Sequence, residues 1–117
     1  MGACVIHGLR LVKRPVRYPD GSTAEELIPE DGGSDFPSYS TVRKTIDFCA
    51  KRGAPEEDWP VFSGIWEGDA DLEDISSRCS RLREHLLKLN ADECARDWWL
   101  ARVRSWLARG EVFAIFE

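Results

Sequence analysis

The chain has 117 residues, of which 43% are hydrophobic and 32% charged, and its 16 basic and 21 acidic side chains give a formal net charge of −5. These values predict one globular domain spanning residues 1–117, with a core that needs neither disulfides nor a metal. They exclude a disordered tail, a collagen-like chain and a disulfide scaffold. The acidic balance also argues against a nucleic-acid binder, which needs basic surface to displace counterions.

No run reaches the roughly 18 apolar residues of a membrane span, and the first residues carry no secretory pattern. We therefore expect a cytoplasmic protein without membrane contact, whose four scattered cysteines are reduced thiols. No phosphate-binding glycine loop and no nucleophile motif occurs, so we predict no cofactor and no catalytic residue.

The first third of the chain predicts a strand followed by a long connection. Residues 4–17 (CVIHGLRLVKRPVR) are rich in β-branched and aliphatic side chains. Within this segment, Gly8 indicates a bulge or a close approach of another backbone. Pro15 indicates that the strand ends there or lies at the edge of the sheet. Residues 18–38 begin with a Pro-Asp-Gly turn signal and are predicted to be one long loop. Loops of that length are usually functional or disordered.

Three helices are predicted in the remainder. The first spans residues 41–52, with Ser40 as its N-cap. After an irregular stretch at 54–70, with a short strand at 61–66, the second helix begins at the N-cap Asp71 and ends at Asn90. Its apolar residues recur at three- and four-residue steps. They are Leu72, Ile75, Cys79, Leu82, Leu86 and Leu89.

The third helix begins at the cap Asp92 and ends at Gly110, and the short link makes it a hairpin with the second. The final segment, VFAIF at 112–116, is apolar on both faces and predicts a central strand paired with the N-terminal strand. The predicted fold is α+β: a small sheet of two or three strands, including both terminal strands, packed against three helices.

Two metal-site interpretations are weaker than their structural alternatives. Cys79, His85 and Cys94 lack the paired spacing of zinc ligands. Residues 69–74 (DADLED) alternate acids as a calcium loop does, but lack its glycine and closing glutamate. The sequence therefore predicts no metal ligand.

The charges are unevenly distributed along the chain. Fourteen of the 21 acids lie in residues 18–40 and 54–74, which contain no lysine or arginine. One interpretation is that these are solvated connections kept polar for solubility. The other is that they converge into an acidic face complementary to a basic protein site.

Trp59 and Trp66 lie in the second acidic segment, where they either cover the core or anchor a partner, since tryptophan is enriched among residues that dominate binding energy. The candidate partner-binding residues are these two tryptophans and the surrounding acids. They are Asp20, Glu25, Glu26, Glu30, Asp31, Asp35, Glu56, Glu57, Asp58, Trp59, Trp66 and Asp69.

These acidic loops with interspersed tryptophans, in a domain closed by VFAIF, resemble the small bacterial immunity proteins that neutralise a partner toxin. The similarity is one of type, and no residue role is carried over. It implies a non-enzymatic inhibitor of a basic partner, such as a toxin domain. Two other functions remain open. One is a small enzyme or ligand-binding domain with a pocket under residues 18–38, near His7 and Cys49. The other is an oligomeric structural adaptor that uses Trp98 with Leu87 or Leu100.

Overall fold

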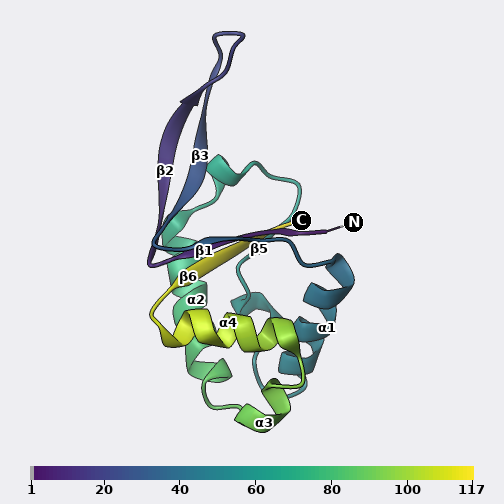
Figure 1. Ribbon diagram of the computed structural model, residues 1–117. Coiled ribbons are helices and arrows are strands. Elements are labelled where there is room, and N and C mark those ends of the chain that lie inside the picture. Colours follow the sequence, from purple (N-terminus) through teal and green to yellow (C-terminus); the bar gives the residue numbers. More distant parts are fainter. Residues whose placement is uncertain (1) are drawn as a thin grey trace.

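The computed structural model describes residues 2–117 and folds them into two β-sheets and four α-helices (Figure 1). The elements in chain order are β1 (Cys4–Gly8), β2 (Arg10–Arg17), β3 (Thr23–Glu30), β4 (Gly33–Asp35), α1 (Tyr39–Ala50), the 3-10 turn η1 (Glu56–Asp58), β5 (Val61–Phe62), the 3-10 turn η2 (Glu67–Asp69), α2 (Leu72–Leu86), α3 (Ala91–Cys94), α4 (Trp98–Ala108) and β6 (Val112–Phe116). The predicted α+β class is confirmed, with more strands and one more helix than expected.

The central sheet has the strand order β4-β1-β6-β5. β1 and β6 are antiparallel, with Val5 opposite Ile115, and β5 runs parallel to β6. The predicted pairing of the two terminal strands is confirmed. Because β6 has a neighbour on each side and is buried on both faces, its uninterrupted apolar sequence is accounted for.

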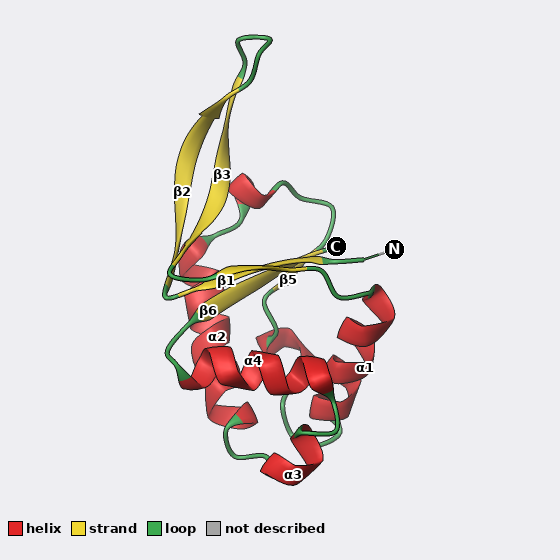
Figure 2. Ribbon diagram, in the orientation of Figure 1, coloured by secondary structure: helices red, strands yellow, loops and turns green. Residues whose placement is uncertain are grey.

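The helices lie on one side of this sheet, and the β2–β3 hairpin extends from the other (Figure 2). The apolar stripe of α2 is buried as predicted, and Asp71 caps the helix by accepting hydrogen bonds from the backbone of Glu73 and Asp74. Trp59, Trp99 and Phe113 form an aromatic cluster within the same core, with ring centroids about 6 Å apart.

Several helix boundaries differ from the prediction. Ser38, and not Ser40, caps α1. The predicted third helix is divided: Asn90 caps α3, and Asp97 caps α4. The division occurs because the Asp97 carboxylate accepts hydrogen bonds from two backbone N–H groups of α4 and from the buried Thr45 hydroxyl. Figure 1 shows α4 crossing α2, so the expected antiparallel hairpin of these helices is wrong.

The largest correction concerns residues 18–38, which are not a loop. β2 and β3 pair over eight positions, from Arg10 opposite Glu30 to Arg17 opposite Thr23, and β4 pairs with β1. The hairpin projects from the body, and the molecule measures 50 × 28 × 21 Å (Figure 1). The single strand predicted at 4–17 is two strands, β1 and β2. The short strand predicted at 61–66 is present only as β5.

The break between β1 and β2 lies where the hairpin crosses the sheet. The Leu9 N–H donates to the Glu30 carbonyl at 2.9 Å. A Cβ on Gly8 would lie 2.5 Å from that same oxygen. The predicted close backbone approach at Gly8 is confirmed, because only a residue without a side chain fits there.

Candidate functional site

The two acidic segments meet where η2 lies along the outer edge of β3. The Trp66 indole Nε1 donates to the Glu25 carbonyl at 2.8 Å. Gly68 brings the η2 backbone onto the same group, since a Cβ there would lie 2.1 Å from the Glu25 oxygen. The same contact brings the carboxylate of Glu67 near that of Glu26.

Among the described residues, no ion pair neutralises the acidic side chains where η2 meets β3. Burial raises the pKa of the Glu67 carboxyl, and the nearby Glu26 charge raises it further. The Cys4 thiol, which donates to Glu67 at 3.9 Å, opposes this only in part. Among residues 2–117, no basic side chain lies within 4 Å of Glu25, Glu26, Glu67 or Asp69.

Two large apolar side chains are exposed beside these carboxylates. Trp66 is 49% exposed and Ile65 is 45% exposed, although both side chains have apolar surface that burial would stabilise. We call these two side chains, together with the acids of η2 and those on either face of the β3 edge, the β3–η2 surface. Its members are Glu25, Glu26, Ile65, Trp66, Glu67 and Asp69.

Four other predicted partner-binding acids are neutralised within the molecule by ion pairs. They are Glu30 with Arg10 at 2.7 Å, Asp35 with Arg102 at 3.2 Å, Glu56 with Arg43 at 3.2 Å, and Asp58 with Arg81 at 3.0 Å. Asp58 is also buried and approaches His85. These four carboxylates form ion pairs between different parts of the fold, so they do not contribute an unpaired acidic surface.

The remaining three acids are dispersed. Asp20 lies at the tip of the hairpin, where hydrogen bonds from the Ser22 hydroxyl and N–H lower the pKa of its carboxyl. Asp31 turns the chain between β3 and β4 with a left-handed φ of 53°. Glu57 is exposed on η1. The predicted acids therefore do not form one continuous face.

Trp59 is wrong as a surface anchor. Its side chain is 1% exposed, stacked on Trp99 and edge-on to Phe113. The ring turns inward from the chain between η1 and β5 because the core beneath β6 has room for a large apolar group. The acidic residues before it in the sequence carry no information about that direction.

The features behind the two rival functions are separated in the fold. Cys49 lies in the core near Cys94 and Asp97, and burial raises its pKa to about 12, whereas the cavity that His7 lines is formed with α4 side chains. Trp98 and Leu87 are exposed, whereas Leu100 is fully buried, so of the two leucines only Leu87 is at the surface with Trp98. In residues 2–117, no three His, Cys, Asp or Glu side chains cluster in a way that could hold a metal ion.

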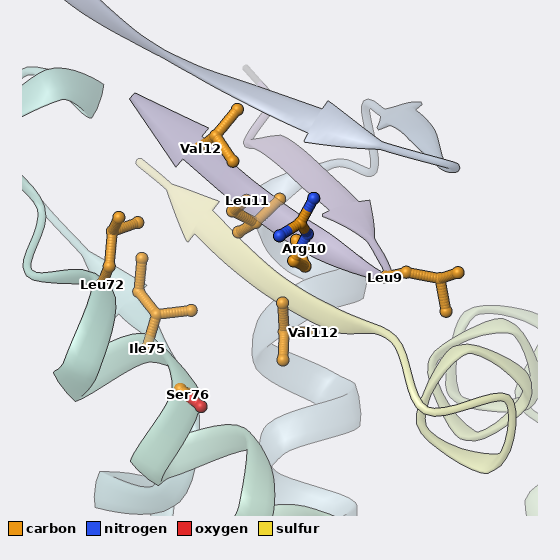
Figure 3. A pocket seen from close by; sticks show the side chains of 8 residues that line it. All are labelled: Leu9, Arg10, Leu11, Val12, Leu72, Ile75, Ser76 and Val112. Atoms are coloured by element: carbon orange, nitrogen blue, oxygen red, sulfur yellow. The ribbon is translucent and has the colours of Figure 1, made fainter. Parts of the chain in front are cut away.

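An apolar cavity of about 200 Å³ lies at the root of the hairpin (Figure 3). Leu11 and Val12 of β2 face Leu72 and Ile75 of α2 across it, and Val112 closes its base. The cavity has few polar groups to orient a ligand, so it has the character of a packing defect between the hairpin and the body.

Sequence reasoning missed Ile65 and Glu67, and also the buried Glu111 that contacts His7 at 2.8 Å. Glu67 could have been found from its acidic segment, but its closeness to Glu26 follows only once β3 is known to be a strand. Glu111 lies 104 positions from His7 in the sequence. Its contact with His7 could have been found only from the register in which β1 pairs with β6.

Within the described part of the chain, no helix is both long enough and apolar enough to cross a membrane. In comparisons with known proteins, no protein-family model, no curated protein and no solved structure matches this chain. A function must therefore be argued from the geometry alone.

Proposed function

We propose that this chain is a non-enzymatic protein-binding domain that docks a basic partner on the β3–η2 surface. The observation that carries the proposal is the closeness of Glu26 and Glu67, which form no ion pair among residues 2–117, beside a half-exposed tryptophan. Bringing like charges together costs free energy in the isolated protein. A cationic partner would relieve that cost on binding.

The two components of this surface have different roles in such a complex. Long-range attraction from the carboxylates raises the rate of encounter with a positively charged protein. Trp66 and Ile65 then supply apolar contact area, and tryptophan is among the side chains that carry most binding energy. The indole is already oriented by its hydrogen bond to Glu25, so little side-chain entropy is lost.

The finer part of the proposal is an inhibitor of the immunity type, in which the acidic surface covers the cationic cleft of a toxin domain. A cytoplasmic location belongs to the same proposal. It is supported by the four free thiols, because unpaired cysteines persist in a reducing compartment.

The test begins with the full chain used to capture and identify its partner in the source cell, followed by binding kinetics with the purified pair. The triple charge reversal Glu25→Lys, Glu26→Lys and Asp69→Lys should slow association at least tenfold at low ionic strength. Trp66→Ala should instead speed dissociation at least tenfold.

A matched control reverses three exposed acids elsewhere, Glu57, Glu84 and Asp92, and so changes the net charge equally. If the control slows association as much as the β3–η2 reversal, the attraction is general and the proposed surface is wrong. Unchanged association in the β3–η2 variant would overturn it as well.

A further inference from the structure

A second polar cluster lies on the other side of the central sheet, where α4 runs beneath β1 and β6 (Figure 2). It borders an open cavity of about 420 Å³. No acidic side chain lines this cavity among the described residues. Its lining consists of His7, Ala101, Arg102, Ser105, Trp106 and Arg109.

His7 is held in one orientation from two directions. Its ring stacks on Trp106, with centroids 4.1 Å apart and planes 11° from parallel. Its Nδ1 lies 2.8 Å from Oε1 of Glu111, whose side chain is 4% exposed. A Cβ at Gly33 would lie 3.8 Å from Nε2, so the glycine leaves space on that side of the ring.

Glu111 is an ionised acceptor in this cluster. Burial by itself would raise the pKa of its carboxyl, but hydrogen bonds from His7 and Arg109 outweigh burial and lower the pKa. Arg109 donates to Oε2 from Nε at 2.9 Å and from Nη2 at 2.6 Å. Since the carboxylate can only accept, Nδ1 of His7 donates, and Nε2 is the ring nitrogen that remains for a ligand.

The two arginines line the same cavity as His7. Asp35 accepts from Nε of Arg102 at 3.2 Å, which leaves both terminal amino groups of that guanidinium without a partner among residues 2–117. Arg109 donates from Nη1 to the Ser105 hydroxyl at 3.0 Å. The carboxylates that balance these cations, Asp35 and Glu111, are not among the residues that line the cavity.

We propose that this cavity binds the phosphate group of a small molecule. Arg102 and Arg109 donate to its oxygens, His7 lines the same cavity, and Glu111 is the positioning residue for His7. Guanidinium groups recognise the oxygens of phosphate through paired hydrogen bonds. A network that only held α4 against the sheet would not require the terminal amino groups of Arg102 to remain free at an open cavity.

The test follows the His7 ring by NMR while inorganic phosphate, and separately glycerol phosphate, is added to the full chain up to about 20 mM. We expect saturable shifts of the His7 ring signals at constant pH and ionic strength. The charged groups around the cavity are Arg102 with its partner Asp35, and Arg109 with its partner Glu111. Tighter binding of glycerol phosphate would indicate a phosphorylated metabolite, and equal binding would indicate free phosphate.

Arg102→Gln should weaken phosphate binding at least tenfold, and Arg102→Lys should restore part of it. Arg102 is half exposed, so neither variant should prevent folding. Arg96→Gln, an exposed arginine outside this cavity, is the matched control and should bind as the natural chain does. The proposal is overturned if His7 does not respond to phosphate, if chloride at equal ionic strength gives the same shifts, or if the Arg96 variant loses as much affinity as the Arg102 variant.

Discussion

Replacing Trp59 by alanine should lower the free energy of unfolding by about 3–5 kcal/mol, the range for truncating a large aromatic side chain in a core. The indole is 1% exposed and contacts Trp99 and Phe113, so its removal leaves a cavity lined by rigid aromatic groups. Its Nε1 has no hydrogen-bond partner among residues 2–117, and the whole loss is therefore one of packing. Such a loss is a large part of the 5–15 kcal/mol that stabilises a typical domain.

Trp66→Ala is the matched comparison, because it deletes the same side chain from the surface. Trp66 is 49% exposed and makes one hydrogen bond, to the Glu25 carbonyl. Its removal should cost less than about 2 kcal/mol. The two tryptophans, seven positions apart in one acidic segment, should thus differ clearly in their effect on stability.

Equilibrium unfolding in urea, followed by far-ultraviolet circular dichroism, measures both variants without relying on tryptophan fluorescence. With a slope of about 1–3 kcal/mol per molar urea, Trp59→Ala should lower the midpoint by about 1 M or more. Equal losses in the two variants, or a loss below about 2 kcal/mol for Trp59→Ala, would refute the assignment of Trp59 to the core.

Three further substitutions test the structure around the two candidate sites. Asp97→Ala removes the cap of α4 and the acceptor of the buried Thr45 hydroxyl, and should cost about 2–4 kcal/mol in urea unfolding. Adding Thr45→Val should recover part of that loss, and no recovery would argue against the hydrogen bond. Gly32→Ala places a Cβ 1.9 Å from the His7 carbonyl oxygen and should lower stability by at least about 3 kcal/mol, seen as a large drop in Tm. The pKa of Glu111 in the folded protein lies below its ordinary value of 4.5. Its carboxylate therefore stabilises the fold above pH 4.5, and this stabilisation is lost as the pH falls through the lowered pKa. Glu111→Gln should therefore unfold more easily than the natural chain near neutral pH and approach it in acid, and a difference independent of pH would contradict this.

Elements whose own side chains determine their burial were predictable. The stripe of α2 repeats at helical spacing with Asp71 before it, and both the helix and its cap are found where expected. The same holds for β6, which is too apolar to lie at a surface. In each case the pattern is local, and no knowledge of a distant partner was needed.

β3 was missed because its structure depends on its partner. Residues 23–30 (TAEELIPE) contain helix formers, acids and a proline, and have no clear alternation. They pair with β2 across a Pro-Asp-Gly turn, where Arg10 lies opposite Glu30 and both Arg10 and Arg14 form ion pairs with that carboxylate. Opposite charges at mirrored positions around that turn were the available signal, since cross-strand pairs of this kind stabilise a hairpin.

The pairing of β2 with β3 also changes the meaning of the acidic segments. Counted along the chain, residues 18–40 are free of bases, but in space Glu30 is neutralised by Arg10 and Asp35 by Arg102. What remains uncompensated is the smaller β3–η2 surface. Net charge by segment therefore indicates a functional surface only after the pairing of the strands is known.

The alternation of side chains along β1 keeps the two proposed sites apart. Cys4 faces Glu67 on the hairpin side of the sheet, and His7, three positions on, faces α4 on the helix side. An acidic, apolar surface and a cavity lined by cations thus lie on opposite faces, where neither neutralises the other. The consequence is testable: reversing the charges of the β3–η2 surface should leave the phosphate response of His7 unchanged, and Arg102→Gln should leave association with a basic partner unchanged. If either substitution altered both activities, the cluster and the surface would form one site, and the separation argued from β1 would be wrong.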